Sequence, residues 1–419
     1  MFVPRALRGE RWRVRILKVS KSAVYARGEE LLEASPERIE PKCESFGICG
    51  GCDLLHMSYD EELRFKLKHC NDALERIGGV DFRISEIVPA EQTENYRCKN
   101  ICAVGGTTGT VNLGFYRKRS HQIVPSNNCE IQSLFAQKAA ETVRVWLGKS
   151  KKAPYDESTG RGTLRHIWTR VSASSGEGQL VLVTARGLGD TSELLSELRR
   201  NCPELKSLLL CVNKSRGNTV LNGELYTLWG SDTISERLCG FDFELSPRSF
   251  FQVNPPQAER LYELARGYAG LSKNETALDL YCGAGTITLC LSRDAGRVIG
   301  AEIVSDAVSD ARENARRNEV QNAEFMEADA AEAARKLEVP IDVVVVDPPR
   351  RGLAESVITD IAEISPKRVV YISCNPGTLA RDLGRFEQLG YRVTAGTCVD
   401  MFPRCADLET VVLLESTDK

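Results

Sequence analysis

The chain has 419 residues, of which 42% are hydrophobic and 27% charged, a balance that excludes a disordered protein. Its formal net charge of −3 argues against a general coat protein for nucleic acids. It contains no apolar run of about 18 residues and no signal-peptide core, so we expect a cytoplasmic protein with no membrane partner. The 15 cysteines should then be reduced, and serve as buried residues, metal ligands or a nucleophile.

The N-terminal segment is basic and has the pattern of a strand. Residues 1–21 contain seven Arg or Lys against a single Glu, although such a run is more often a solvated face than a track for RNA. Charged and apolar side chains alternate over 11–16, which predicts a small β module in residues 1–41. Apolar residues at helical spacing over 58–78, followed by Gly79, predict a helix.

Two larger domains follow in the pattern. Short β-like segments with one or two helical stretches predict an α+β central domain over 42–247. From 248 to 419 helices and apolar strands alternate, which predicts a doubly wound α/β sheet whose site lies beyond the carboxyl ends of its strands. Predicted helices cover 257–269, 286–293, 304–317, 330–337 and 353–363, and predicted strands cover 276–281, 297–302, 323–327, 341–346 and 367–373.

The first two strand exits of this sheet predict a nucleoside site. Gly283 and Gly285 form a tight turn that lets a ligand approach the backbone. Glu302 ends the second strand, where a carboxylate can accept hydrogen bonds from ribose hydroxyls. Thr288 replaces the third glycine of a dinucleotide fingerprint, which favours a nucleoside without pyrophosphate, such as S-adenosylmethionine.

The next exits add the groups for a methyl transfer. Asp329 ends the third strand, and Asp347 ends the fourth in a turn stiffened by two prolines. Cys374 ends the fifth, where a thiolate can attack a substrate, and the segment 400–409 offers three carboxylates as a base. Methylation at carbon 5 of a pyrimidine needs both, because that carbon becomes nucleophilic only after a thiolate adds to carbon 6.

Several motifs together resemble the RNA uracil-5-methyltransferase family, the bacterial enzymes that make 5-methyluridine in 23S ribosomal RNA or transfer RNA. They are "SPRSFFQVN", "DLYCGAGTITL", "DPPRRG", "VVYISCNPGT" and "DMFPRCADLE", and the resemblance covers about residues 2–415. It implies that Cys374 is the nucleophile and Glu409 the base. It also implies a class I, Rossmann-like methyltransferase domain, whose S-adenosylmethionine and uracil pocket is lined by Gln252, Tyr281, Thr286, Glu302, Asp329 and Asp347. The chain departs from the family pattern at Arg404, Cys405 and Asp407.

A second cluster of cysteines lies outside this motif set. Cys43, Cys49 and Cys52 are packed into ten residues, and Cys129, in a loop-like position, is our candidate for a fourth ligand. Spacing alone leaves zinc and an iron–sulfur cluster open. The resemblance implies a [4Fe–4S] cluster, as in the ribosomal-RNA members of the family, and it relates residues 2–16 to the second half of a TRAM domain, a small β-barrel that binds RNA.

The remaining cysteines and two histidines lack ligand spacing. His56 and His166 are predicted to be structural or surface residues. The cysteines predicted to lie in the core are Cys70, Cys98, Cys102, Cys202, Cys211, Cys239, Cys282, Cys290 and Cys398.

The leading hypothesis is a monomeric enzyme that methylates carbon 5 of a specific uridine in 23S ribosomal RNA. A transfer-RNA uridine methyltransferase is the nearest alternative. A non-catalytic RNA-binding or ribosome-assembly factor is a second one, in which the altered segment 404–407 would reflect lost activity. An amino-methyltransferase is disfavoured, because Arg350 stands where those enzymes carry an aromatic residue after Asp-Pro-Pro.

Overall fold

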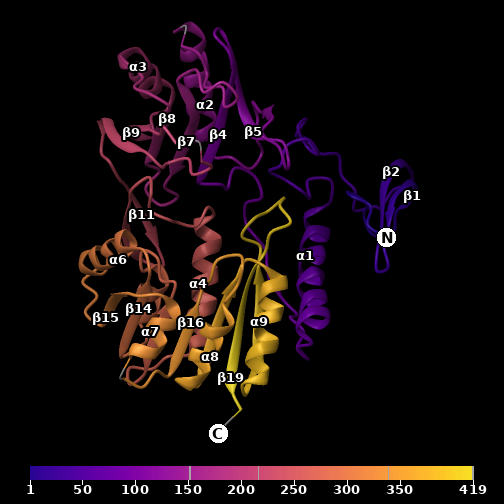
Figure 1. Cartoon of the computed structure of the whole chain (residues 1–419), viewed down its shortest axis with the longest axis vertical. Helices are drawn as coiled ribbons and strands as arrows, with labels where there is room; N and C mark the ends of the chain where they lie inside the picture. The colour runs from indigo at the N-terminus through magenta and orange to yellow at the C-terminus, as the bar shows by residue number, and fades with distance from the viewer. Residues whose placement is uncertain (151, 216, 338, 418–419) are drawn as a thin grey trace.

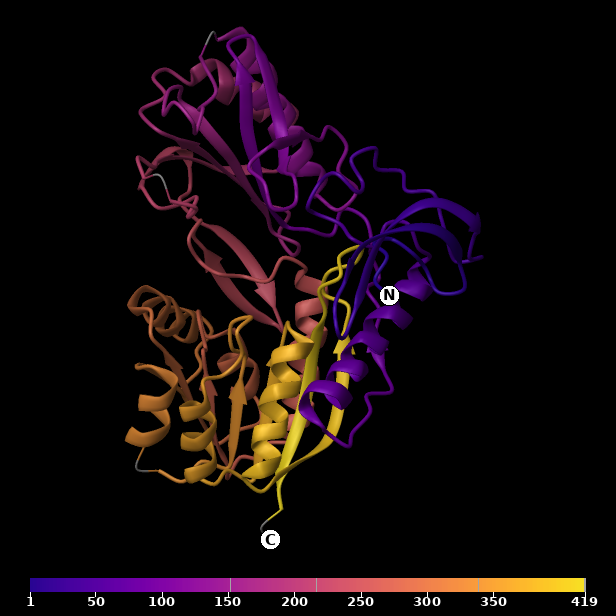
Figure 2. The ribbon, with the colours of Figure 1, turned by 45° about the vertical axis from the view of Figure 1, so that its right-hand side comes forward.

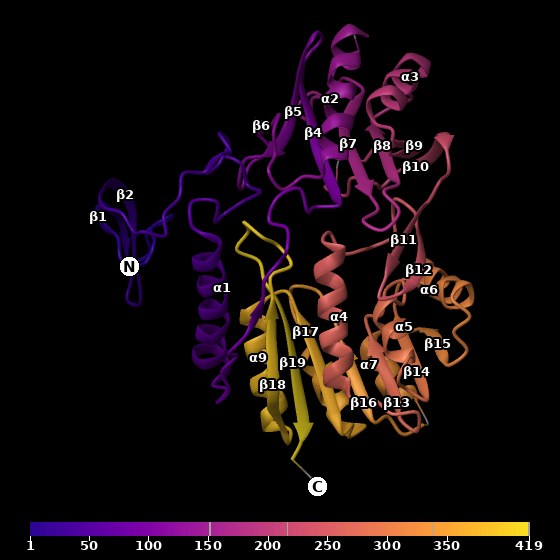
Figure 3. The ribbon, with the colours of Figure 1, turned by 180° about the vertical axis from the view of Figure 1, so that it is seen from behind.

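A computed structural model describes residues 1–150, 152–215, 217–337 and 339–417. Figure 1 shows an N-terminal hairpin to one side, a central domain above and a C-terminal domain below. A two-stranded ribbon, β11 (Ile234–Leu238) and β12 (Phe241–Leu245), lies between the two larger parts (Figures 2 and 3). No helix within the described ranges is long and apolar enough to cross a membrane.

The N-terminal hairpin pairs β1 (Arg11–Val19) with β2 (Val24–Glu33). Its basic strand is matched by acidic residues on the other, since Arg11, Arg13 and Arg15 form ion pairs with glutamates across the hairpin. The positive charges of these three arginines are therefore compensated within the hairpin, and they do not form a continuous basic surface. The TRAM-like barrel stays a prediction, because the described residues of this segment contain only these two strands.

The central domain is a seven-stranded sheet of order β10-β9-β8-β7-β4-β5-β6, antiparallel except for the β8–β9 pair. Helices α2 (Leu134–Lys149) and α3 (Ser192–Asn201) pack on it, and their apolar faces share one core with the sheet. The α+β prediction for this region is confirmed. Its strands are β4 (Lys99–Thr107), β5 (Thr110–Tyr116), β6 (Ile123–Pro125), β7 (Leu164–Val171), β8 (Gly178–Thr184), β9 (Leu205–Val212) and β10 (Glu224–Gly230).

The C-terminal domain contains an eight-stranded sheet of order β15-β14-β13-β16-β17-β19-β18-β3, with β19 antiparallel to both its neighbours. Its doubly wound core agrees with the predicted elements to within about two residues at each end. The strands are β13 (Thr276–Leu280), β14 (Arg297–Glu302), β15 (Ala323–Glu327), β16 (Val343–Val346), β17 (Arg368–Ser373), β18 (Tyr391–Val399) and β19 (Glu409–Ser416), joined at one edge by β3 (Ile87–Val88).

Helices cover both faces of this sheet, as a buried parallel sheet requires. One face carries α4 (Pro255–Ala269), α5 (Thr286–Ser292) and α6 (Ser305–Arg317). The other carries α7 (Ala330–Lys336), α8 (Glu355–Glu363), α9 (Pro376–Gln388) and α1 (Tyr59–Ala73). The four consecutive valines of β16 are fully buried between these layers.

The placement of α1 differs from the expected domain boundary. The segment 59–88 precedes the central sheet in the chain, but it packs on the C-terminal sheet beside α9 (Figure 3). A π-helical turn, Leu74–Gly78, follows α1 and approaches α9 so closely that a Cβ on Gly78 would lie 2.4 Å from the Ala380 carbonyl oxygen. The sequence predicted a continuous central domain over 42–247. The apolar face of α1 is instead buried against the C-terminal sheet and α9, so the segment 59–88 packs with the C-terminal domain.

Candidate active site and cysteine cavity

The turn after β13 forms one wall of a small cavity at the carboxyl edge of the sheet. Tyr281, Gly283 and Gly285 have φ values of 68°, 55° and 83°, so the chain reverses sharply into α5. A Cβ on Gly283 would meet nothing within 4 Å, which leaves the backbone open to a ligand. A Cβ on Gly285 would lie 3.0 Å from the Phe325 ring, so packing also favours glycine there.

Most of the residues predicted for the cofactor surround this cavity. Its wall includes Gln252, Tyr281, Gly283, Thr286 and Asp347. The other three, Gly285, Glu302 and Asp329, are not in its wall. The Glu302 carboxylate accepts hydrogen bonds from the backbone N–H groups of Gly283 (3.2 Å) and Val304 (2.9 Å). Asp329 caps α7 by accepting from the Glu332 N–H at 2.8 Å.

Carboxyl groups beneath the cavity are desolvated. Burial raises the pKa of Asp347 to about 7 and that of Asp279 to about 7. Thr288 donates a hydrogen bond to Asp279 at 2.6 Å, so the residue that replaces the third glycine supports the floor of the turn. Burial thus disfavours the charged form of both carboxyls.

Strand pairing brings Cys374 and Glu409 to the same point of the sheet edge. Ser373, the last residue of β17, pairs with Thr410 of the antiparallel strand β19. Cys374 directly follows Ser373 and Glu409 directly precedes Thr410, so this register brings the two side chains close together although 35 residues separate them in sequence. The Glu409 carboxylate accordingly acts on the Cys374 thiol electrostatically. Glu409 is 4% exposed, and its Oε2 has no hydrogen-bond partner among the described residues.

The electrostatics of this pair are set by burial and by Arg350. Burial and the nearby Glu409 raise the pKa of the half-buried Cys374 thiol to about 11, against a lowering influence of Arg350. Burial, with Asp347 and Asp407, raises the pKa of Glu409 well above its usual range. Arg350 also forms an ion pair of 2.9 Å with Asp407. Its carbonyl accepts from the Asn375 side chain at 3.1 Å, which ties the two strand exits together.

A separate cavity of about 400 Å³ is lined by the clustered cysteines. Cys43, Cys49, Cys52 and Cys129 are all half-buried and line it together with Cys405. Burial raises the pKa of the Cys129 thiol, and the neighbouring thiols of Cys43 and Cys49 raise it further. Within residues 1–150, 152–215, 217–337 and 339–417, no three His, Cys, Asp or Glu side chains have an arrangement that would hold a metal ion.

Comparison with known proteins decides the family. The model of the tRNA (uracil-5-)-methyltransferase family matches residues 209–417. An uncharacterized RNA methyltransferase of Clostridium acetobutylicum is 41% identical over 100% of this chain and 93% of its own, and one of Listeria innocua is 40% identical over 99% and 92%. The crystal structure of the Pyrococcus abyssi tRNA (uracil-54, C5)-methyltransferase with S-adenosyl-L-homocysteine superimposes with a TM-score of 0.79, at 29% identity over 98% of this chain and 95% of that one.

The chain belongs to the RNA uracil-5-methyltransferase family. It is accordingly an S-adenosylmethionine-dependent RNA methyltransferase, and the class I methyltransferase fold predicted for its C-terminal domain is confirmed. The resemblance of the motifs thus identified the family correctly. RNA as the substrate class is also confirmed.

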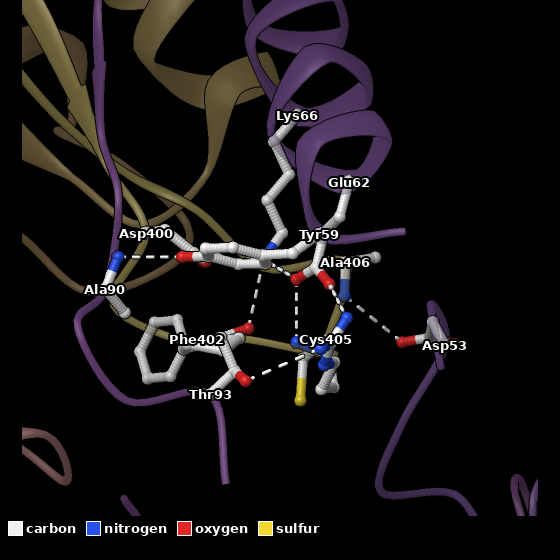
Figure 4. A network of polar contacts seen from close by, with 12 residues as sticks. Asp53, Tyr59, Glu62, Lys66, Ala90, Thr93, Asp400, Phe402, Cys405 and Ala406 are labelled. Atoms are coloured by element: carbon white, nitrogen blue, oxygen red, sulfur yellow. Dashed lines mark hydrogen bonds and ion pairs between the residues drawn. The ribbon is translucent and has the colours of Figure 1, made fainter. Parts of the chain in front are cut away.

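In this chain, residues 400–404, which precede Glu409, are bound to α1 by a buried network of ion pairs and hydrogen bonds (Figure 4). Lys66 is fully buried, and its Nζ contacts Glu62 at 2.8 Å and Asp400 at 2.6 Å and donates to the Phe402 carbonyl at 3.0 Å. The Tyr59 hydroxyl donates to the second Asp400 oxygen at 2.7 Å. Because the charges are compensated within the protein, the network can be buried without leaving an isolated ion.

The three departures from the family pattern all have partners in this chain. Arg404 donates from its backbone N–H to Glu62 at 2.6 Å, and its guanidinium lies over the Tyr59 ring at 5.4 Å. The Cys405 thiol donates to the Gly51 carbonyl at 3.1 Å, and Asp407 pairs with Arg350. The segment 404–407 is therefore held by contacts with Glu62, Gly51 and Arg350.

Sequence reasoning missed several groups around the site. Tyr262 lies within the predicted helix 257–269 but was not singled out, and its phenol contacts Thr286 and Gln252. Lys66 lies in an ordinary amphipathic pattern, and Cys405 was noted only as a departure. The sequence contained one indication of the role of Lys66. A helical projection of 59–73 places this lysine on the same face as Cys70 and Ala73, which is the buried face of α1. The nine cysteines predicted to lie in the core are all buried, as expected.

The first prediction concerns Lys66. We expect Lys66→Met to lower the free energy of unfolding by about 3–5 kcal/mol, because it leaves Asp400 buried without a cation and leaves Glu62 paired with Arg404 alone. We also expect a fall in kcat for RNA methylation that exceeds the change in the Kd for S-adenosylmethionine, since the segment bearing Glu409 loses its anchor. Urea unfolding and steady-state methylation measure these effects.

The matched control for Lys66→Met is Lys68→Met on the same helix. Lys68 is 65% exposed and forms its ion pair with Asp72 in solvent, so its removal should cost about 0.5 kcal/mol or less. Equal effects of the two substitutions on stability and kcat would contradict the anchoring role of the network.

Proposed function

We propose that this enzyme methylates carbon 5 of a specific uridine in 23S ribosomal RNA through a covalent adduct on Cys374. The observation that carries the mechanism is the adjacency of Cys374 and Glu409 at the ends of two paired strands. A thiol and a carboxylate side by side match the two demands of the reaction, which are addition at carbon 6 and removal of the proton at carbon 5.

The steps balance with these two side chains. The Cys374 thiol first loses its proton to solvent, and its sulfur then forms a bond to carbon 6, which leaves an electron pair shared between carbon 5 and O4. S-adenosylmethionine, when bound, supplies an electrophilic methyl group, which bonds to carbon 5 while S-adenosylhomocysteine leaves with the electrons of the broken sulfur–methyl bond. Glu409 then takes the proton from carbon 5, the carbon 5–carbon 6 double bond reforms, and Cys374 leaves as a thiolate.

Burial prepares Glu409 for this role. Its pKa is raised well above the usual range, so the ionised carboxylate is a stronger proton acceptor than an exposed glutamate. The unpartnered Oε2 is available to a substrate proton, which supports the assignment of Glu409 over the two aspartates of the same segment. Asp400 is held by Lys66 and Tyr59, and Asp407 by Arg350.

For the cofactor, we propose that the cavity beside the β13 turn holds the nucleoside part of S-adenosylmethionine. The open space at Gly283 admits a ligand to the backbone, and the Glu302 carboxylate lies at the strand end suited to ribose hydroxyls. Gln252, Tyr281, Thr286 and Asp347 would complete its wall, with Gly285 supporting the turn and Asp329 beside it.

We also propose that Cys43, Cys49, Cys52 and Cys129 hold a [4Fe–4S] cluster. The four thiols line one cavity, and the backbone N–H of Gly51 donates to the Cys49 sulfur at 3.4 Å, the kind of contact that favours thiolate ligands. Binding would require the four side chains to converge, because they do not form a metal-holding group among the described residues. When bound, such a cluster would supply a rigid cross-link between segments 43–52 and 129.

The choice of 23S ribosomal RNA rests on the resemblance of this cysteine set to that of the ribosomal-RNA members. Transfer RNA is the second candidate, favoured by the similarity to the Pyrococcus abyssi enzyme. Mass-spectrometric mapping of 5-methyluridine in both RNAs, in cells with and without the gene, separates the two. Loss confined to transfer RNA would overturn the ribosomal assignment, and an unchanged pattern in both would overturn the enzymatic proposal.

The second prediction tests the nucleophile and the base. Cys374→Ala should abolish 5-methyluridine formation when it replaces the wild-type protein in a deletion strain. Glu409→Gln should accumulate a covalent protein–RNA adduct that migrates slowly on a denaturing gel, because the proton at carbon 5 is retained and the thiolate cannot leave. Cys211→Ala on β9 is the control, a buried cysteine whose loss should leave methylation active. Activity of Cys374→Ala near the wild-type level would refute its role.

The third prediction concerns pH. Because the pKa of Cys374 is about 11, the thiolate fraction and kcat/KM should rise between pH 6 and 9. Arg350 lowers that pKa, so Arg350→Gln should raise it further and reduce kcat/KM about tenfold for each unit of pKa, at every pH in this range. Arg351→Gln is the neighbouring control. Superimposable pH profiles for wild type and Arg350→Gln would exclude an electrostatic role.

The fourth prediction concerns the cysteine cavity. Protein purified without oxygen should be brown and contain about four irons and four sulfides per chain. Cys129→Ser should lose most of the iron, whereas Cys102→Ser, a buried cysteine outside the cavity wall, should keep it. A colourless wild-type protein that contains zinc would contradict an iron–sulfur cluster.

A further inference from the structure

A third cavity, of about 530 Å³, lies in the central domain and shares no wall residue with the active site or the cysteine cavity. It opens between the end of β5, the start of β7 and the segments 155–157 and 217–220. Its volume falls within the range of about 300–1,000 Å³ that is typical of small-molecule sites. The proposed reaction makes no use of it.

Aromatic rings form the walls of this cavity. Tyr116, half-buried at the end of β5, stacks on His121 with ring centroids 5.1 Å apart and an angle of 27°. On the other side Tyr155 is covered by the Arg165 guanidinium, at 4.8 Å from the ring centroid. Flat rings and a guanidinium plane are the surfaces on which unpaired nucleic-acid bases stack.

The floor contains buried polar atoms without partners. Arg165 and His166, at the start of β7, are 7% and 8% exposed. The Arg165 side chain is fixed by donating to the carbonyls of Asn213 (2.9 Å) and Ser215 (2.7 Å), but its Nε has no hydrogen-bond partner among the residues that the structure describes. His166 contacts the Tyr116 hydroxyl through Nε2 at 3.4 Å, whereas its Nδ1 has no partner within the described part of the chain. Buried polar atoms that lack partners are costly, and a ligand with hydrogen-bonding edges would satisfy them.

The rim adds charge of both signs. Glu157 accepts a hydrogen bond from the Tyr116 hydroxyl at 3.3 Å and contacts His121 at 2.7 Å, so a carboxylate acceptor stands at the opening. Arg117 and Arg119 follow Tyr116 in the chain, are exposed, and form no ion pair with the residues that the structure describes. Phosphate groups of a nucleic acid could be neutralised there while a base enters the cavity.

A metal site explains the cavity less well. His121, His166 and Glu157 line it, but they do not form a metal-holding group within the described ranges. The aromatic walls and the arginine on the floor are also foreign to a cation site.

We propose that this cavity binds one unpaired base of the RNA substrate, at a nucleotide other than the one that is methylated. The inference rests on RNA as the substrate but not on which RNA it is. The enzyme would thus hold its substrate at two separated unpaired nucleotides, and select RNA whose local structure exposes both. The backbone also links this site to the cysteine loop, since the Gly50 N–H donates to the Tyr116 carbonyl at 3.2 Å.

The fifth prediction tests this site with Tyr116→Leu and Tyr155→Leu. Each should raise the Kd for a 23S ribosomal RNA fragment that the wild type methylates, or for transfer RNA if that is the substrate, by about tenfold. The rise in KM should exceed any fall in kcat. Tyr226→Leu is the matched control, an exposed tyrosine on β10 of the same sheet, and should change the Kd less than about twofold.

Further measurements keep the outcome decisive. Tyr155→Phe should retain tight RNA binding, because the ring is preserved, and an unchanged Kd for S-adenosylmethionine would exclude general misfolding. Values of Kd for Tyr116→Leu and Tyr155→Leu equal to that of Tyr226→Leu would overturn the inference. Nucleoside monophosphates are the second probe. If Tyr116→Leu and Tyr155→Leu abolish the binding of these nucleotides but leave the Kd for RNA unchanged, the cavity is a site for a free nucleotide. That result would also overturn the inference. Failure of the wild type to methylate RNA would refute the proposed function alone, since RNA binding is measured separately.

Discussion

The buried contact between Lys66 and Asp400 is the constraint on which the arrangement of the site depends. These residues are separated by 334 positions, and both are fully buried. Asp400 begins the segment that leads to Glu409, so the ammonium group of α1 determines where that segment starts. Water cannot replace the interaction in a fully buried position, and the charge of Lys66 therefore demands carboxylates from both parts of the chain.

From this anchor the segment 400–408 runs along the cysteine loop before it enters β19. The backbone N–H groups of Asp53 and Leu54 both donate to the Arg404 carbonyl at 3.0 Å, and Cys405 reaches into the cysteine cavity. The cavity and Glu409 are thus joined by a short, hydrogen-bonded stretch of chain. Any group bound by the cysteines would stiffen the same stretch, which gives the cysteine site a physical connection to the proposed base without a role in the chemistry.

The distribution of charge is explained by pairing at short range. The net charge of −3 hides a basic N-terminal run, yet three of its arginines are matched by glutamates on the neighbouring strand. Arg117 and Arg119, which follow Tyr116 in the chain, are exposed and form no ion pair with any residue that the structure describes. The sequence of β1 alone does not show the pairing with β2, because the alternation of one strand does not reveal the charges of its partner.

The sequence by itself determined the helices and strands between residues 255 and 373, and the family. Alternating helices and apolar strands depend on local spacing, so their bounds were predicted to within about two residues, and the motifs around Gly283, Asp347 and Cys374 identified the methyltransferase family. The tertiary structure alone decided where α1 packs and that Cys374 lies close to Glu409. It also decided that Tyr262 and Lys66 support the site, and that Arg165 and His166 line a separate cavity. These facts depend on contacts between residues far apart in the chain, and such contacts are selected by burial and hydrogen bonding in the folded molecule, which a periodic pattern does not record.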